Sequence, residues 1–175
     1  MHPRLSVTVV ALAAAGLAAP AAAQQAAAEH HMPKPSRGFA QLTPLAGEWE
    51  GKSPDGKTMR VSYQVVSGGN ALLERLQMGT EPEMVTVYAP DGDRVAVTHF
   101  CSAGNEPQMQ TAPIASDVKQ FSFDFVHASN LASPTEGHMH HLTLTIPDRD
   151  HLTQEWTWQE NGQSRTTAFQ FTRKS

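Results

Sequence analysis

Hydrophobic and polar residues alternate along most of the chain, in short segments that turn-forming residues separate. In residues 58–66, for example, Met59, Val61, Tyr63 and Val65 occupy every second position, so an extended chain would place them on one face. Segments of this kind recur about every 10 to 12 residues, which is typical of all-β sandwiches and barrels. The pattern therefore predicts an all-β protein.

Hairpin turns, such as the Pro-Asp-Gly-Asp sequence at residues 90–93, join these segments. The predicted strands are 47–53, 58–66, 71–78, 83–89, 94–101, 108–112, 118–127, 138–146, 151–159 and 164–173. The segment 71–78 also fits a helix, but a helix of that length between two hairpin turns would be isolated, so we favour a strand. Because closure of a meander removes its exposed edges, we predict an antiparallel up-and-down barrel of about ten strands.

A short helix is predicted before the first strand, within residues 36–46. Phe39, Leu42 and Leu45 are spaced for one helical face, and Pro44 limits the length of the helix. The predicted fold is thus a barrel that is preceded by one short helix.

The first 23 residues have the features of a secretory signal peptide. Arg4 gives a positive start, residues 5–19 are small or apolar, and the alanines at 21–23 fit the small-residue cleavage rule. The apolar run is too short for a convincing membrane anchor. We therefore expect a periplasmic or secreted protein, with residues 24–35 as a flexible segment before the barrel.

Removal of this leader would leave 152 residues (175 less 23), enough for a single domain, which we place at residues 36–175. The full chain carries a net charge of −4, and loss of Arg4 with the leader takes it to −5. Nucleic acid and anionic membranes are therefore not expected partners. Since Cys101 is the one cysteine, an internal disulfide is excluded.

The predicted strand 94–101 carries the most unusual chemistry. Val95, Val97, His99 and Cys101 alternate on its apolar face, so a histidine and the cysteine lie two residues apart. A buried histidine must find a hydrogen-bond partner. A satisfied core histidine is the ordinary interpretation of His99, and a ligand-binding or metal-binding histidine is the alternative.

A second group of histidines opens the predicted strand 138–146. His138 and His140 lie at i and i+2, a spacing that suits a metal ion on a strand. Together with His99 they would form a histidine site for zinc or iron, and two histidines with a carboxylate such as Glu155 would suit the same metals. The sequence itself requires no cofactor. Under the histidine-site hypothesis, the cofactor would be zinc or haem. Exposed histidines at the end of a strand are the ordinary alternative.

Gly47, Trp49 and Gly51 form a Gly-x-Trp-x-Gly pattern on the first strand, directly after the short helix. This arrangement resembles the calycin superfamily, which includes lipocalins, fatty-acid-binding proteins and the ten-stranded nitrobindins. The resemblance implies an antiparallel barrel with an internal cavity. It also implies that Trp49 plugs one end of the barrel beneath an arginine of the last strand, for which Arg165 and Arg173 are the candidates.

The chain departs from members of this superfamily. It lacks the disulfides of true lipocalins and has more predicted strands than they have. No single C-terminal histidine matches the haem-binding histidine of nitrobindins. The segment 98–107 (Thr-His-Phe-Cys-Ser-Ala-Gly-Asn-Glu-Pro) also resembles a pattern in small exported bacterial proteins of unknown function. That second resemblance implies no activity.

We therefore predict an exported barrel that binds a small apolar or amphipathic molecule in a mainly apolar cavity. The predicted ligand-binding residues are Tyr63, His99, Cys101, Asn105, Phe123, His140 and Trp156. A metal or haem protein built on the histidines is the second hypothesis, and a structural module with a filled core is the third. No Ser-His-Asp order, P-loop, Rossmann fingerprint or His-Glu-x-x-His motif is present, so an enzyme is not the favoured class.

Overall fold

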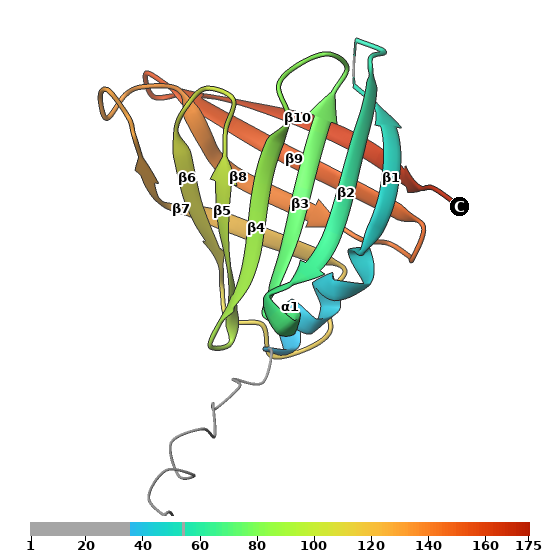
Figure 1. Ribbon diagram of the computed structural model, residues 1–175. Coiled ribbons are helices and arrows are strands. Elements are labelled where there is room, and N and C mark those ends of the chain that lie inside the picture. The colour runs from blue at the N-terminus through green and yellow to red at the C-terminus, as the bar shows by residue number, and fades with distance from the viewer. Residues whose placement is uncertain (1–35, 54) are drawn as a thin grey trace, which may run out of the picture. The chain divides into compact units, whose positions relative to one another are not determined.

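The computed structural model describes residues 36–53 and 55–175 and shows a closed antiparallel barrel (Figure 1). Each strand pairs with its neighbours in sequence, and the first strand closes the barrel against the last. The strands are β1 (Gly47–Lys52), β2 (Thr58–Val66), β3 (Ala71–Met78), β4 (Met84–Asp91), β5 (Arg94–Phe100), β6 (Glu106–Thr111), β7 (Gln120–Ser129), β8 (His138–Thr145), β9 (His151–Glu160) and β10 (Gln163–Arg173). The predicted up-and-down topology is confirmed, including the strand assignment of residues 71–78.

The signal-peptide and linker predictions fall on residues 1–35, which lie outside the described residues. Within the part of the chain that the structure describes, no helix has the length and apolar character needed to cross a bilayer.

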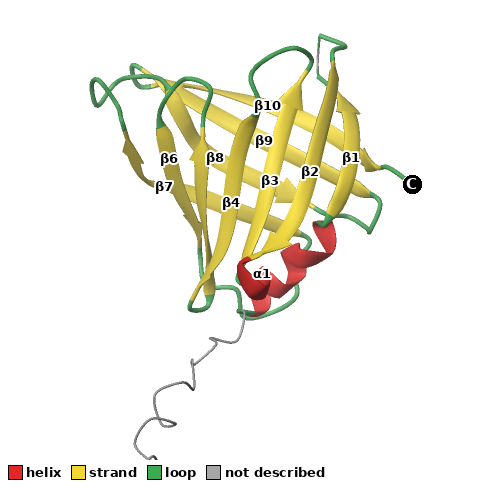
Figure 2. Cartoon of the chain, viewed as in Figure 1, coloured by secondary structure: helices red, strands yellow, loops and turns green. Residues whose placement is uncertain are grey.

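One end of the barrel is covered by the predicted helix, α1 (Arg37–Leu42), which runs on into the 3₁₀ turn η2 (Thr43–Leu45) (Figure 2). The Ser36 hydroxyl caps α1 by accepting a hydrogen bond from the backbone N–H of Phe39 at 3.2 Å. Phe39, Leu42 and Leu45 are all buried, as their spacing predicts. Pro44 falls in η2, where the chain tightens before β1 begins. We call this end the closed end.

Trp49 fills the closed end of the barrel and is fully buried. Its indole N–H donates to the carbonyl oxygen of Leu45 at 2.8 Å, and the guanidinium carbon of Arg173 lies 4.2 Å from the centre of the indole. Arg173 also donates to the carbonyl oxygen of Ala46 at 2.8 Å. The arginine over the tryptophan is therefore Arg173 and not Arg165, which lies at the other end of β10.

A side chain is excluded at each of the two glycines of the Gly-x-Trp-x-Gly pattern, for a different steric reason. Gly47 adopts a φ of 128°, and a Cβ there would lie 2.9 Å from a guanidinium nitrogen of Arg173. A Cβ at Gly51 would lie 2.1 Å from the carbonyl oxygen of Gln170, on the neighbouring strand β10. Both positions thus permit the close seam between β1 and β10 that shuts the barrel.

A β-bulge changes the face that β7 presents after Phe125. Met109 of β6 pairs with Phe125, and the preceding residue, Gln108, pairs with His127. One residue of β7, between Phe125 and His127, is therefore left unpaired. Sequence alternation places Phe121, Phe123, Phe125 and His127 on one face. That expectation is wrong for His127, which is exposed, because the bulge inverts the alternation after Phe125.

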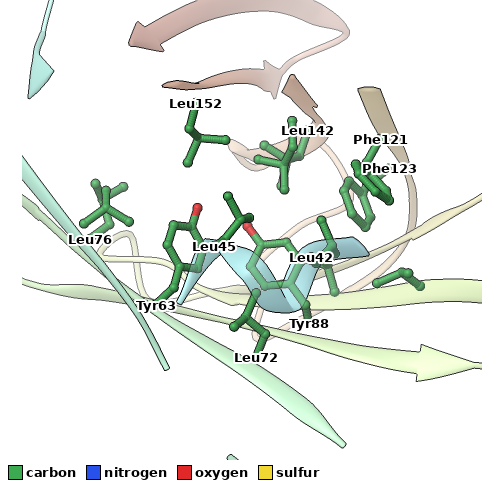
Figure 3. Close-up of a cluster of buried hydrophobic side chains, with 14 of the residues drawn as sticks. Leu42, Leu45, Tyr63, Leu72, Leu76, Tyr88, Phe121, Phe123, Leu142 and Leu152 are labelled. Carbon is green, nitrogen blue, oxygen red and sulfur yellow. The ribbon is translucent and has the colours of Figure 1, made fainter. Parts of the chain in front are cut away.

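The core occupies the closed half and the middle of the barrel. Figure 3 shows Tyr63 and Tyr88 in this cluster with Leu45, Leu72 and other leucines around them. The two tyrosine ring centres are 6.4 Å apart, and both residues are buried. Tyrosine hydroxyls in such a core need hydrogen-bond partners, and polar side chains inside the barrel supply them.

Candidate functional site

A glutamate lies fully buried at the centre of the barrel. The hydroxyl of Tyr88 donates to Glu74 Oε2 at 2.7 Å, and the side-chain amide of Gln154 donates to the same oxygen at 3.1 Å. The hydroxyl of Thr86 lies 3.4 Å from Glu74 Oε1. Glu74 itself has no exposed surface. The buried carboxyl group is thus held by neutral donors from one neighbouring strand, β4, and one distant strand, β9.

Gln154 extends this group of hydrogen bonds across the barrel. Its amide nitrogen also donates to the hydroxyl of Tyr63 at 2.6 Å, and its amide oxygen accepts from the indole N–H of Trp156 at 2.9 Å. Tyr63 is on β2, whereas Gln154 and Trp156 are on β9. The contacts therefore tie opposite walls of the barrel together through its interior.

His99 is the member of this group with an unused atom. Its Nδ1 lies 2.9 Å from the hydroxyl of Thr86, and its ring centre is 4.6 Å from that of Trp156. His99 is buried, yet its Nε2 has no hydrogen-bond partner. We call the hydrogen-bonded residues the interior network: Tyr63, Glu74, Thr86, Tyr88, His99, Gln154 and Trp156.

Strand register explains why three of these residues meet. Glu74 of β3 is directly opposite Thr86 of β4, and Thr86 is directly opposite His99 of β5. Directly opposite residues on neighbouring strands share a face and have side chains close together. Leu72 and Leu76 flank Glu74 at alternate positions and are buried, so Glu74 must point inward with them.

Burial shifts the pKa values of the ionisable groups in the interior network. Removal from water raises the pKa of Glu74, against the opposing effect of its hydrogen bonds, of which the one from Tyr88 is the strongest. Burial, together with the nearby Glu74 carboxylate, raises the pKa of Tyr63 and of Tyr88 well above their usual range. Burial also lowers the pKa of His99 to about 4. At neutral pH the His99 ring is therefore uncharged.

The end opposite α1 is open, and we call it the open end. Several inward-facing side chains there are only partly buried, in contrast to those in the middle of the barrel. These residues are Met78, Cys101, Phe125, His140, Trp158 and Phe169. A pocket of about 550 Å³ opens at this end. Met78, Phe169 and Thr167 line it together with the charged residues Asp55, Lys57, Glu81 and Arg165. Solvent therefore reaches the mouth of the barrel at this end.

The two predicted metal histidines of β8 do meet at the open end. His138 Nε2 lies 3.2 Å from His140 Nδ1, and the ring of Phe125 stacks on His140 with 4.5 Å between ring centres. Partial burial and the neighbouring histidines lower the pKa of His140. Among residues 36–53 and 55–175, no three His, Cys, Asp or Glu side chains come together as a metal-binding group. The His99, His138 and His140 metal site thus stays a prediction, of which the structure brings together the last two.

The other predicted ligand residues fall in different places. Phe123 is fully buried and packs edge-on against Tyr88, with 5.9 Å between ring centres. Cys101 is half-buried beyond the end of β5. Asn105 is buried, and its side-chain amide donates to the carbonyl oxygen of Gly137 at 2.9 Å. Asn105 therefore joins two loops of the open end, although its Oδ1 atom has no partner.

Ser122, Asp124 and His141 form a second polar cluster on the outer surface of β7 and β8. His141 Nδ1 lies 3.1 Å from an Asp124 carboxylate oxygen, and His141 Nε2 lies 3.3 Å from the Ser122 hydroxyl. The order of contacts matches that of a nucleophilic triad. The side chain of Asp124 is 78% exposed, however, and the paired strands use their backbone N–H groups within the sheet. A nucleophilic site also needs free hydrogen-bond donors that stabilise an oxyanion. We therefore interpret this cluster as a row of solvent-exposed, hydrogen-bonded side chains.

Another pocket of about 550 Å³ lies beside α1, at the closed end. Its charged residues are of both signs, with Asp117 and Asp148 near Lys119 and Arg149, and none of the interior network lines it. The open-end pocket also carries charges of both signs, and none of the interior network lines it either. We favour the open end as the candidate ligand site because His99, with its unpartnered Nε2, lies one residue from the open end of β5.

Sequence reasoning missed Glu74, Thr86 and Tyr88. A signal for Glu74 was present, since it falls between two leucines at alternate positions of a predicted strand. Its hydrogen-bond partners required the cross-strand register, which only the closed barrel provides.

Comparison with known proteins finds no protein-family model that matches the chain and no curated protein that is similar to it. The architecture, a closed ten-stranded antiparallel barrel with a short helix at one end, is consistent with a calycin-like fold.

Proposed function

We propose that this protein is an exported binding protein that holds one small, largely apolar molecule in the open end of its barrel. The open end offers aromatic and apolar side chains that are only partly buried, and the interior network lies beneath them. Aromatic and apolar side chains combined with a few fixed polar groups are typical of small-molecule sites. Export is the part of this proposal that rests on the leader sequence alone.

The unpartnered Nε2 atom of His99 is the observation that carries the proposal. Leaving a buried polar atom without a hydrogen bond costs about 1–3 kcal/mol, so such atoms are uncommon unless something else satisfies them. A bound molecule with one hydrogen-bonding group would do so. A purely structural core, the competing hypothesis, leaves this atom without a hydrogen bond.

The proposal predicts saturable binding of an uncharged apolar fluorophore at the open end. N-Phenyl-1-naphthylamine is a suitable probe, because its emission rises in apolar surroundings. Thr167 lines the open-end pocket, so Thr167→Trp should fill it and weaken binding at least tenfold. Thr166→Trp is the matched control, since Thr166 directly precedes Thr167 in β10 and is exposed on the other face of the strand. Its affinity should equal that of the wild type.

Fluorescence titration measures both affinities, and far-ultraviolet circular dichroism confirms that each variant is folded. Failure of the wild-type protein to bind the probe saturably would contradict the proposal. Equal affinities of Thr167→Trp and the wild type would show that binding takes place elsewhere on the molecule.

A further inference from the structure

We infer that the ligand is an uncharged aromatic alcohol whose hydroxyl group hydrogen-bonds to His99 Nε2. This inference rests on the proposed function and adds the chemical class of the ligand to it. It follows from three features of the barrel interior: the rings around His99, the hydrogen bonds that fix its other nitrogen, and the charges that surround it.

Aromatic rings lie beside His99 and at the open end of the barrel. The Trp156 ring lies 4.6 Å from the His99 ring, and Phe125 stacks on His140 nearer the open end. Trp158 adds a partly buried ring on β9, two residues beyond Trp156. Planar aromatic molecules stack favourably against such surfaces at separations of about 4.5–7 Å between ring centres. The shape and chemistry of the wall thus favour a flat ring over a flexible aliphatic chain.

The hydrogen bonds of Thr86 determine what His99 requires from a ligand. The Thr86 hydroxyl has one proton and lies between Glu74 Oε1 and His99 Nδ1. If Glu74 is ionised, Thr86 donates to it, His99 Nδ1–H donates to Thr86, and Nε2 is left as an acceptor. If Glu74 carries a proton on Oε1, each of these bonds reverses, and Nε2–H becomes a donor.

A hydroxyl group satisfies His99 in both of these states, because it can donate and accept. A ketone or an ether only accepts, and so matches only the state in which Glu74 is protonated. An ammonium group only donates and matches only the other state. Of the groups compared, the hydroxyl therefore binds with the least dependence on the protonation of Glu74.

Charged ligands fit this position poorly. Besides His99, the ionisable groups of the interior network are Glu74 on β3, Tyr63 on β2 and Tyr88 on β4. The interior network, as defined above, contains no lysine or arginine to neutralise a bound anion. The carboxyl oxygens of Glu74 already accept from neutral donors, so a cation would have to displace them. A neutral hydroxyl avoids both costs.

The test compares two ligands that differ in one group, 2-naphthol and 2-methoxynaphthalene. Isothermal titration calorimetry at pH 8 should show 2-naphthol binding about tenfold more tightly to the wild type, the effect of one buried hydrogen bond. His99→Phe keeps a ring at this position and removes Nε2, so it should abolish the preference. The wild-type preference should also persist at pH 6, a measurement that needs no variant.

The outcomes separate this inference from the proposed function. Equal affinities of the wild type for both ligands would overturn the aromatic-alcohol inference, as when a water molecule satisfies Nε2, and would leave the binding protein intact. A preference that survives in His99→Phe would overturn the role of Nε2. Absence of binding by both ligands, together with failure of the fluorophore titration, would overturn both proposals.

Discussion

Replacing Glu74 with leucine should lower the free energy of unfolding by about 4 kcal/mol, even though leucine is apolar and the site is in the core. The variant removes the acceptor of the Tyr88 hydroxyl and of one Gln154 N–H, and it leaves Thr86 with only His99 as a partner. Each donor stranded in the core costs about 1–3 kcal/mol. Chemical denaturation followed by circular dichroism measures the loss.

Two matched variants show whether the stranded donors cause this loss. Glu74→Gln keeps an acceptor oxygen in a side chain of the same length, so its loss should be about 1 kcal/mol. The double variant Glu74→Leu with Tyr88→Phe removes one stranded donor and should be more stable than Glu74→Leu alone. A Glu74→Leu variant as stable as the wild type would show that the interior network makes no net contribution to stability.

Acid should destabilise the protein through His99. Its pKa is about 4 in the folded barrel and 6.5 in the reference state, so between these values the unfolded chain binds a proton that the folded chain does not. Proton binding by His99 therefore does not lower the free energy of unfolding above pH 6.5. Below pH 6.5 the free energy of unfolding decreases as the pH falls towards 4. With His99 almost fully buried, the loss should be about 3 kcal/mol.

Glu74 acts in the opposite direction on the same pH scale. Because burial raises its pKa, its contribution to stability is present below the reference value of 4.5 and is lost as the pH rises through the folded value. Denaturation curves at a series of pH values should therefore show a shallower pH dependence in His99→Phe and a steeper one in Glu74→Gln. A wild-type stability that stays constant from pH 7 to pH 4, with the same result in both variants, would contradict the assigned pKa shifts.

The strands were predictable from the sequence because alternation and turn residues are local signals. Gly92 in its hairpin turn and the alternating Met59, Val61 and Tyr63 of β2 each determine structure within a few residues. The bulge in β7 was not predictable, since it depends on how β7 pairs with β6, and His127 was placed on the wrong face for that reason.

The site was predictable only in part. His99 and Trp156 follow from alternation on single strands, and both are buried as that pattern indicates. Their connection through Thr86, Glu74 and Gln154 joins residues up to 80 positions apart, so it depends on barrel closure and on register. Alternation along one strand gives a side chain its face but not its partners.

Native mass spectrometry of the protein purified from its own host tests the binding account most directly, with metal analysis and an absorption spectrum of the same sample. We expect one retained organic molecule per chain, with neither stoichiometric metal nor a haem absorption band. Metal at about one ion per chain, or a Soret band, would contradict the account and assign the function to the histidines of the barrel.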